Sequence, residues 1–378
     1  MNILFITPSE VQPLNGGIER TTLALSRQLH GEYGYMCRFM NLVKGCSKEQ
    51  LEAEIQAQHI DIIIAQGADK RIANLLPLLR TIIDEKNWKI ILLFAFHSNP
   101  GVELATMDYG ALLYSIFHNI NTKAAIRQLG WQVLKPFIEG RMIKHLKKKY
   151  RLPYDYSTKL VLLSERFIPE YQFFSGGEQS HFRAIPNMLP LNESDCTPAA
   201  KEKVILLVSR MEERQKRIKL ALQIWRRIPR NGWKLKIVGA GEDLNYFLFL
   251  AKKWDLKDVS FEGRQNPIPY YRKASIFMMT SAFEGLPMTI LEAQQNRCVP
   301  VVFDTFASLK DVVTDGRNGF VVPEGNIDGY VSRLTQLMKE ESLRKEMAEN
   351  AVKDCQRFAP QKVAAQWDAL FKELVNQQ

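Results

Sequence analysis

The sequence SIFMMTSAFEGLPMTILEA, residues 275–293, has the pattern of a strand, a short loop and a helix. Its run Ser275–Met279 is typical of a buried strand, and the Gly-Leu-Pro loop that follows predicts a helix beginning near Pro287. Similar units recur along the chain, where short apolar runs alternate with amphipathic helices. This alternation is typical of a parallel sheet whose two faces are covered by helices.

The predicted strands form two groups on either side of a polar, proline-bearing stretch at 187–202, which we expect to be a linker. A chain of 378 residues exceeds what one hydrophobic core usually supports. The sequence therefore predicts an α/β protein of two Rossmann-like, doubly wound domains that face a cleft. Residues 100–155 have a helical pattern, and a last helix is expected at about 361–375. The predicted strands are 3–6, 60–65, 89–96, 159–163, 204–208, 235–238, 275–279 and 299–303.

The composition is that of an ordinary folded protein, with 46% hydrophobic and 24% charged residues. Five cysteines occur without a CxxC pair, which favours a reducing, cytoplasmic setting. The first residues lack the pattern of a signal peptide, and no apolar run approaches the ~18 residues of a membrane span. The net charge of +10 is concentrated in segments 135–151 and 210–236, which indicates particular anionic partners.

Gly16 and Gly17 lie between the first predicted strand and a helix expected at about 19–29. Glycines let a backbone approach a phosphate closely, and the helix behind them offers free N–H groups and a positive dipole end. The pair is equally compatible with a tight turn, and no GxGxxG pattern follows it. Both interpretations are therefore open for this segment.

Arg210 directly follows the strand 204–208 and its Ser209, and Lys216 comes shortly after it. Cations at the carboxyl end of a strand are well placed to neutralise a diphosphate, since arginine binds two oxygens at once and lysine adds a mobile charge. This position favours a functional role for Arg210 over a solvated basic surface. A second glycine-rich stretch, Val238–Glu242, also follows a strand and is interpreted as a turn.

Glu284 lies just ahead of the predicted helix, and Glu292 lies about two helical turns further on. This spacing brings both carboxylates toward one face, where they can accept sugar hydroxyls while the amides of residues 286–289 meet a phosphate. The alternative is an acid favoured by the helix dipole and an unrelated surface glutamate. His97 ends the strand 89–96, where a substrate role and a structural role are both open.

Taken in order, these motifs resemble those of glycosyltransferase family 4, which are retaining enzymes with the GT-B fold. The resemblance is clearest from 185 to 330, good over 1–30 and thin between 100 and 155. No single motif would suffice, so the ordered set carries the resemblance. The matching segments are Gly16–Arg20, Ile185–Asn187, Val208–Met211 with Lys216 and Arg217, Glu284 to Glu292, and Asp315–Val322.

The resemblance implies a role for each matching residue. Arg210 and Lys216 would hold the donor diphosphate and stabilise it as the leaving group, with Glu284 near the donor sugar. Glu292 would bind the ribose hydroxyls, and Arg264 would lie near the nucleobase. The implied catalytic set is Arg210, Lys216, Glu284 and His97, the last close to the transferred sugar. The implied donor-binding set is Gly16, Gly17, Arg264, Leu286, Pro287, Met288, Thr289 and Glu292.

The resemblance also implies a domain organisation and a reaction. Residues 1–188 with 356–378 would form an acceptor-binding domain, and residues 189–355 would bind the nucleotide sugar. The reaction would move a hexose, with retention of configuration, to a glycan or lipid-linked acceptor in bacterial surface-polysaccharide assembly. The sequence has no DxD, HExxH or Cys/His metal pattern, so we expect neither a metal nor another cofactor.

The sequence departs from the family pattern at two places, and the second, near the expected donor pocket, leaves the donor open between UDP and GDP sugars. Arg297 and Cys298 stand where a glycine is common, and Ala307 and Ser308 stand where a glycine pair precedes the acid near Asp311. An NAD-dependent nucleotide-sugar epimerase or dehydrogenase is the alternative, although it should show GxGxxG and a Tyr-x-x-x-Lys pair. Nucleic-acid binding rests on net charge alone, without a recognised motif, so we expect no nucleic-acid partner.

Segment 131–151 combines apolar residues at helical spacing with a cluster of lysines. Such a helix can lie on the anionic inner face of the plasma membrane and bring the active site to a lipid-linked or lipopolysaccharide acceptor. The alternative is a helix packed on the sheet with a solvated basic edge, and Pro136 and Gly140 weaken an uninterrupted helix. The apolar residues are Trp131, Leu134, Ile138, Met142 and Leu146, and the lysines are Lys144, Lys147, Lys148 and Lys149.

Overall fold

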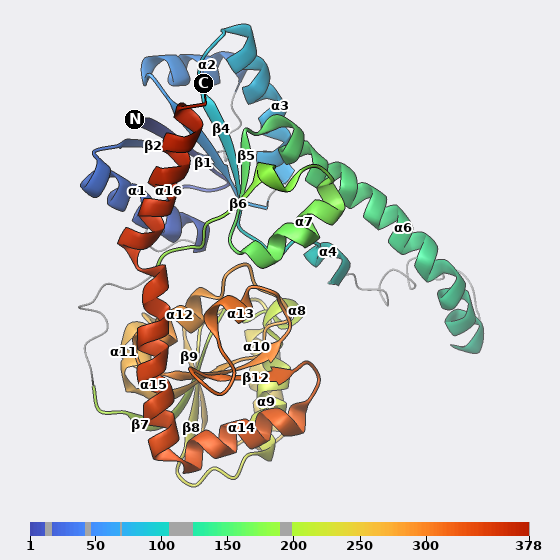
Figure 1. Cartoon of the computed structure of the whole chain (residues 1–378). Coiled ribbons are helices and arrows are strands. Elements are labelled where there is room, and N and C mark those ends of the chain that lie inside the picture. Colours follow the sequence, from blue (N-terminus) through green and yellow to red (C-terminus); the bar gives the residue numbers. More distant parts are fainter. Residues whose placement is uncertain (12–16, 42–46, 69, 106–123, 190–198, 378) are drawn as a thin grey trace. The chain divides into compact units, whose positions relative to one another are not determined.

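The chain forms two compact units in the computed structural model (Figure 1). The structure describes all residues except 12–16, 42–46, 69, 106–123, 190–198 and 378, and in helix α6 it describes side chains from Pro136 onward. Unit 1 consists of Met1–Glu10 and Met36–Ala184, and unit 2 consists of Val11–Tyr35 and Ile185–Gln378. Each unit is built on one six-stranded sheet, which confirms the predicted α/β class with two Rossmann-like sheets.

Unit 1 holds a sheet with the strand order β2-β1-β3-β4-β5-β6, in which neighbouring strands pair in parallel. The central strands β3 and β4 are buried along their whole length because both faces of a doubly wound sheet are covered by helices. The strands are β1 Asn2–Thr7, β2 Met36–Asn41, β3 Ile62–Gln66, β4 Ile91–Phe96, β5 Lys159–Leu162 and β6 Phe182–Ala184; the helices are α2 Lys48–Ala57, α3 Lys70–Glu85, α4 Val102–Ala105, α6 Ala124–Tyr156 and α7 Ile168–Ser175, with the 3-10 turns η1 Glu165–Phe167 and η2 Gln179–His181.

Unit 2 holds a second parallel sheet, in the order β12-β11-β10-β7-β8-β9. Its strands are β7 Glu202–Val208, β8 Lys234–Val238, β9 Val259–Gly263, β10 Ala274–Met279, β11 Val299–Asp304 and β12 Phe320–Pro323. Its helices are α1 Gly17–Tyr33, α8 Glu213–Lys216, α9 Ile218–Arg227, α10 Leu244–Lys253, α11 Ile268–Lys273, α12 Met288–Gln295, α13 Leu309–Val312, α14 Ile327–Lys339, α15 Glu341–Cys355 and α16 Pro360–Val375, with the 3-10 turn η4 Gln356–Phe358.

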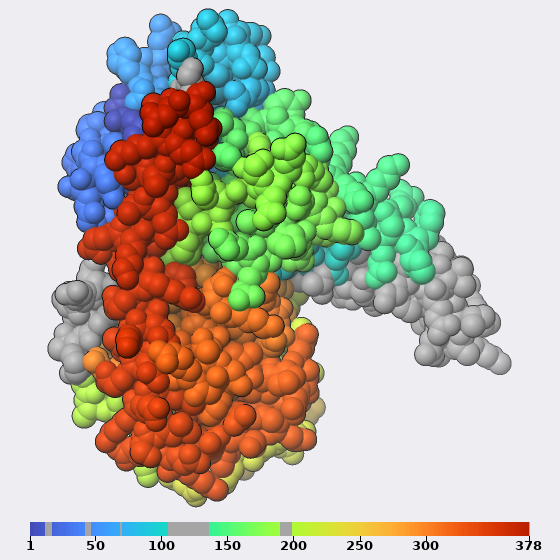
Figure 2. Space-filling view, in the orientation of Figure 1, coloured from blue at the N-terminus to red at the C-terminus, as the bar shows by residue number. Residues whose placement is uncertain are grey.

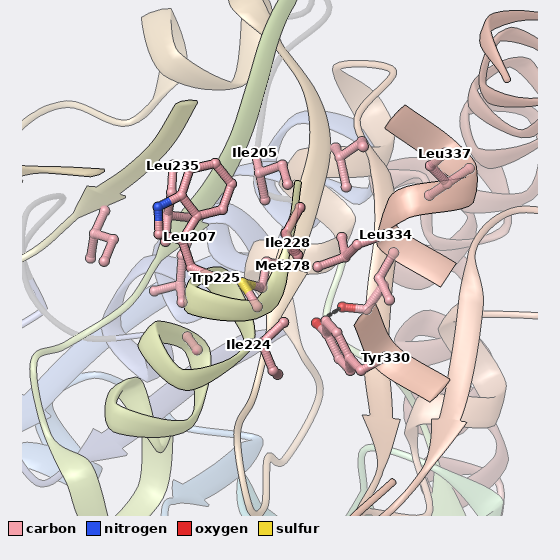
Figure 3. Packing of buried hydrophobic residues seen from close by; sticks show 14 of the residues in the cluster. Ile205, Leu207, Ile224, Trp225, Ile228, Leu235, Met278, Tyr330, Leu334 and Leu337 are labelled. Atoms are coloured by element: carbon pink, nitrogen blue, oxygen red, sulfur yellow. Dashed lines mark hydrogen bonds between the residues drawn. The ribbon is translucent and has the colours of Figure 1, made fainter. Parts of the chain in front are cut away.

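The core of unit 2 lies between its sheet and the helices α9 and α14 (Figure 3). Two large amphipathic side chains anchor these helices. Trp225 is buried on α9 and donates its indole N–H to the carbonyl oxygen of Lys257 at 2.9 Å. Tyr330 is buried on α14, and its hydroxyl donates to the carbonyl oxygens of Met279, at the end of β10, and Val301, within β11. Both polar groups are thus satisfied within an apolar core.

Helix α1 belongs to unit 2 because it packs against the last helix, α16. The Tyr35 hydroxyl, just after α1, donates to the Asp368 carboxylate at 2.5 Å, and its ring lies against Phe371. Burial is the main cause that raises the pKa of Tyr35, and the bond to Asp368 adds to it. The predicted domains group residues 11–35 and 356–378 with the first sheet instead, and that assignment remains a prediction.

Two expectations about local structure need correction. The pattern does not predict β2, β6, β9 or β12, which are the four edge strands of the two sheets. Helix α6 runs from Ala124 to Tyr156 without a break, although Pro136 and Gly140 predict an interruption.

No helix among the described residues is both long and apolar enough to cross a membrane.

Candidate active site

The candidate active site of unit 2 lies where β7 and β10 end. These two strands are parallel neighbours, so the residues that follow them meet at one edge of the sheet. Lys216, at the end of α8, places its Nζ 2.6 Å from Oε1 of Glu284, which follows β10. The two side chains are only 13% and 12% exposed, so the ion pair is screened little by water. Two predicted catalytic residues are thereby brought together.

The backbone at Lys216 is fixed to the end of β10. The Thr280 hydroxyl donates to the carbonyl oxygens of Lys216 and Arg217, at 2.8 and 3.1 Å. Arg217 has a left-handed φ of 50°, which ends α8 and starts α9. Residues other than glycine rarely adopt this conformation, so contacts with the surrounding chain must stabilise it. The backbone of Lys216 is therefore fixed at a position from which its side chain reaches Glu284.

Gln215 connects the two sides of this site, and the sequence does not predict its role. Its Oε1 accepts a hydrogen bond from Nη2 of Arg210 at 2.8 Å. Its Nε2 donates to the Phe283 carbonyl oxygen at 3.1 Å and to Oε2 of Glu284 at 3.4 Å. Arg210 also pairs with Glu212 at 3.5 Å, while its side chain remains 70% exposed. Two side chains thus hold the guanidinium, and its exposed surface can bind an anion.

The glycine-rich stretch after β8 is a turn, as predicted, and it supports the loop that carries Arg210. Ser209 N–H donates to the Val238 carbonyl oxygen, and Met211 N–H donates to that of Ala240. A Cβ at Gly239 would lie 1.8 Å from the Ser209 carbonyl oxygen, and one at Gly241 would lie 2.5 Å from that of Met211. The two loops therefore cross so closely that only glycine fits on the β8 side.

Glu292 is 2% exposed on α12, so its interpretation as an unrelated surface glutamate is wrong. Its Oε2 accepts a hydrogen bond from the Tyr271 hydroxyl at 2.8 Å, and its Oε1 pairs with Nη2 of Arg20 at 2.8 Å. Burial, and next the charge of Glu292, raise the pKa of Tyr271. Glu284 and Glu292 have different hydrogen-bond partners.

The loop before α12 is held by the segment that follows β11. The Ser308 hydroxyl donates to the Gly285 carbonyl oxygen at 2.5 Å, and the Thr305 hydroxyl donates to that of Ser281 at 2.7 Å. The helix starts at Met288, as predicted. The Met288 amide already donates to the Leu286 carbonyl oxygen at 2.9 Å, and Pro287 has no N–H. Of the predicted amide donors, only Leu286 and Thr289 are left for a phosphate.

The remaining predicted donor residues lie at several places in unit 2. Gly17 begins α1, whereas Gly16 lies outside the described residues. Arg264 is exposed just after β9, where Gly263 has a φ of 70° and accepts a bond from the Gly239 amide. A cavity of about 170 Å³ lies along one face of α1, and its lining includes Gly17, Arg20, Thr21, Ala24, Arg27 and Met288.

His97 lies in unit 1, directly after β4. The residue is half-buried, and neither ring nitrogen has a hydrogen-bond partner among the residues that the structure describes. Burial lowers the pKa of His97 to about 4, so the imidazole is neutral near pH 7. A neutral ring with two unused nitrogens can either donate or accept a hydrogen bond to a ligand hydroxyl.

The departure at Arg297 and Cys298 has a local structural effect. Arg297 has a left-handed φ of 58°, the conformation that glycine adopts without strain, and its Nε bonds to Glu349 at 2.7 Å. Cys298 is buried, and its thiol contacts the carbonyl oxygens of Tyr271 and Ala274 at 3.0 and 3.1 Å. This substitution lies at the amino end of β11, away from the carboxyl ends of the strands.

Two Rossmann-like parallel sheets, with cations and carboxylates at the carboxyl ends of the second, form a GT-B fold. Residues 193–354 match the family model described as "Glycosyl transferases group 1". The family match does not support the epimerase or dehydrogenase alternative.

Similarity to individual proteins agrees with this family. The amylovoran biosynthesis glycosyltransferase AmsD of Erwinia amylovora is 31% identical over 183 residues, which are 48% of this chain and 51% of AmsD. The chain thus spans about half the length of this curated relative. Among solved structures, HepE of Anabaena in complex with UDP has a TM-score of 0.72 at 14% identity, covering 99% of this chain and 100% of HepE. Sucrose-phosphate synthase of Thermosynechococcus elongatus has a TM-score of 0.74 at 15% identity, covering both chains completely.

Proposed function

We propose that this chain transfers a hexose from a nucleoside-diphosphate sugar to a glycan or lipid-linked acceptor, with retention of configuration and without a metal ion. The observation that carries the proposal is the cluster at the ends of β7 and β10, where Arg210 and Lys216 lie beside Glu284. The UDP bound to HepE supports a UDP-sugar donor, and the name of the relative CapM of Staphylococcus aureus, a capsular polysaccharide biosynthesis glycosyltransferase, supports surface-polysaccharide assembly.

In the proposed reaction, the bond between the anomeric carbon of the donor sugar and the β-phosphate oxygen breaks, and its electron pair leaves with the diphosphate. An acceptor hydroxyl oxygen forms the new bond on the same face of the sugar, and its proton passes to the departing diphosphate. Negative charge then develops on phosphate oxygens, which fixed cations stabilise most. Arg210 presents an exposed guanidinium for this purpose, and Lys216 has ammonium donors beyond the one that Glu284 accepts. Glu284, held by Lys216 and Gln215, accepts a hydrogen bond from a hydroxyl of the donor sugar.

Binding of a nucleoside diphosphate can be tested by thermal stabilisation with UDP, GDP, ADP, CMP, NAD and inorganic phosphate, each with and without EDTA. We expect one nucleoside diphosphate to raise the Tm selectively, by an amount that EDTA does not change and that Arg210→Ala abolishes. Stabilisation at about 100 times Kd is worth about 2.7 kcal/mol, which is readily measured. A shift with NAD alone would move the chain to the dehydrogenase class, and loss of the UDP shift in EDTA would contradict metal independence.

We also propose that unit 1 binds an anionic membrane surface through α6 and α7. Leu146 is buried, and Lys149 pairs with Glu103, so part of α6 packs inward as the alternative interpretation expects. The opposite side is basic and exposed, and the described part of α6 lies at the surface (Figure 2). Phe137 is 63% exposed on α6, and Phe173 is 58% exposed on α7, beneath the Nζ of Lys147. The side chains of Trp131 and Leu134 lie outside the described ones. Between residues 136 and 150 of α6, the exposed cations are Arg141, Lys144, Lys147 and Lys148.

Sedimentation with lipid vesicles tests this surface. Each basic residue near an anionic bilayer contributes about 1 kcal/mol, so replacing Arg141, Lys144, Lys147 and Lys148 with Gln should weaken binding to phosphatidylserine vesicles at least 100-fold. Binding to neutral vesicles should be weak for all variants. A matched variant with Lys252, Lys253, Arg226 and Lys234 of unit 2 replaced by Gln has the same net charge and should bind like the wild type. Equal binding by both variants would contradict the assignment to α6.

A further inference from the structure

We propose that Gln215 is a positioning residue that couples Arg210 to Glu284, so that the cation facing the diphosphate and the carboxylate facing the sugar are set together. This inference rests on the proposed transfer reaction for the roles of those two residues. The coupling itself is a property of the ligand-free chain. It is carried by the hydrogen bonds of one side-chain amide, which spans the gap between the ends of β7 and β10.

The orientation of the Gln215 amide is fixed by its neighbours. A guanidinium can only donate hydrogen bonds, so the atom 2.8 Å from Nη2 of Arg210 must be the amide oxygen. The amide nitrogen then faces the Phe283 carbonyl oxygen and the Glu284 carboxylate, which can only accept. Neither partner tolerates a flipped amide. The Gln215 amide therefore has one orientation, with its oxygen toward Arg210 after β7 and its nitrogen toward Glu284 after β10.

Each end of the link restrains a group that would otherwise move. Arg210 is 70% exposed, and a long exposed side chain occupies many rotamers unless a partner selects one. Glu284 has both oxygens engaged, Oε1 by Lys216 and Oε2 by Gln215. Holding such groups in place before the ligand arrives lowers the entropy lost on binding and in the transition state. Gln215 supplies this restraint to Arg210 and Glu284 at once.

The main-chain hydrogen bond of Gln215 is independent of its side chain, so the role of the side chain can be tested by substitution. The Ala282 amide donates to the Gln215 carbonyl oxygen at 2.7 Å, so main-chain bonding already joins the α8 turn to the loop after β10. A substitution that changes only the side chain leaves that bond in place. Gln215 is half-buried rather than part of the apolar core, so its variants should fold.

Two variants separate the halves of the link. Gln215→Ala removes both, and we expect kcat to fall about 10- to 100-fold with a smaller change in the donor KM. Gln215→Glu keeps an oxygen for Arg210 but places a second carboxylate against Glu284, so it should not restore kcat. Glu212→Gln is the matched control, because it weakens the other partner of Arg210 without touching Glu284, and its kcat should stay within about threefold of the wild type.

A double-mutant cycle tests the coupling directly. In an Arg210→Ala background, Gln215→Ala should cost clearly less than in the wild type, because the residue that it positions is gone. An additive cycle in an active enzyme would overturn the inference and leave the proposed function standing.

The coupling also has a readout without substrate. In protein labelled with ¹⁵N-arginine, rotation of the Arg210 guanidinium should be slow in the wild type and in Gln215→Glu, and fast in Gln215→Ala. Equal rotation in the wild type and Gln215→Ala would overturn the inference even if the chain transfers no sugar. Absence of transfer and of nucleotide binding in the wild type would instead contradict the proposed function.

Discussion

Replacing Lys216 with Ala should lower the rate of sugar transfer by about 1,000-fold and also weaken the fold. The activity falls because a fixed cation next to the developing phosphate charge is lost, and removal of one such donor typically costs 100- to 1,000-fold. The fold weakens because Glu284, only 12% exposed, would lose its partner at 2.6 Å. Breaking a buried pair in this way costs about 3 kcal/mol. Transfer assays and urea unfolding measure the two effects.

The two effects of Lys216→Ala can be told apart with further variants. A double variant, Lys216→Met with Glu284→Gln, removes both charges and should recover most of the stability while remaining inactive. Lys310→Ala is the matched control, since Lys310 pairs with Asp304 at 3.2 Å but is 55% exposed, and its loss should cost less than about 1 kcal/mol. If Lys216→Ala retained more than a tenth of wild-type activity, the assignment of Lys216 to the catalytic set would be wrong.

Replacing Gly239 with Ala should be the most damaging single-methyl change in unit 2 to the stability of the fold. The added Cβ would lie 1.8 Å from the Ser209 carbonyl oxygen, which belongs to the main chain and cannot rotate away. The φ of Gly239 is also 145°, which side chains rarely adopt. We expect the free energy of unfolding to fall by at least about 3 kcal/mol, within the range for strain and overpacking combined. Urea unfolding of the purified variant measures the loss.

Gly232→Ala provides the control for the backbone conformation alone. Gly232 has a φ of 81°, and a Cβ there would meet nothing within 4 Å, so the cost should be about 1 kcal/mol. If Gly239→Ala cost no more than Gly232→Ala, the close crossing of the two loops would not exist in solution. Because that crossing carries Ser209, we also expect Gly239→Ala to displace Arg210 and to remove any nucleotide-dependent shift in Tm.

The sequence predicts the central strands well, whereas it misses the edge strands β2 and β9 for a physical reason. Strands such as β3 and β10 are buried on both faces and have continuous apolar runs. The edge strand β2 is half exposed, and none of its six residues is buried. The edge strand β9 is likewise without a buried residue. Such segments do not show the apolar pattern from which the central strands are predicted.

The same contrast applies to the site. Arg210, Lys216 and Glu284 are predictable because they occupy motif positions next to a strand. Their supporting residues are not, since Gln215 reaches Glu284 across 69 positions of sequence and Thr280 reaches Lys216 across 64. The bond from the Met288 amide to Leu286 is likewise a property of the folded turn, so the sequence overstates the number of free amides.

The Glu292 carboxylate has a consequence for how selectively a ligand binds there. Both of its oxygens already hold a donor, Tyr271 on one and Arg20 on the other, and the group is almost fully buried. Each oxygen keeps a further lone pair, so a ligand hydroxyl can bond to Glu292 only along the directions that Tyr271 and Arg20 leave open. Contact with Glu292 would then discriminate among ligands by the direction of their hydroxyls.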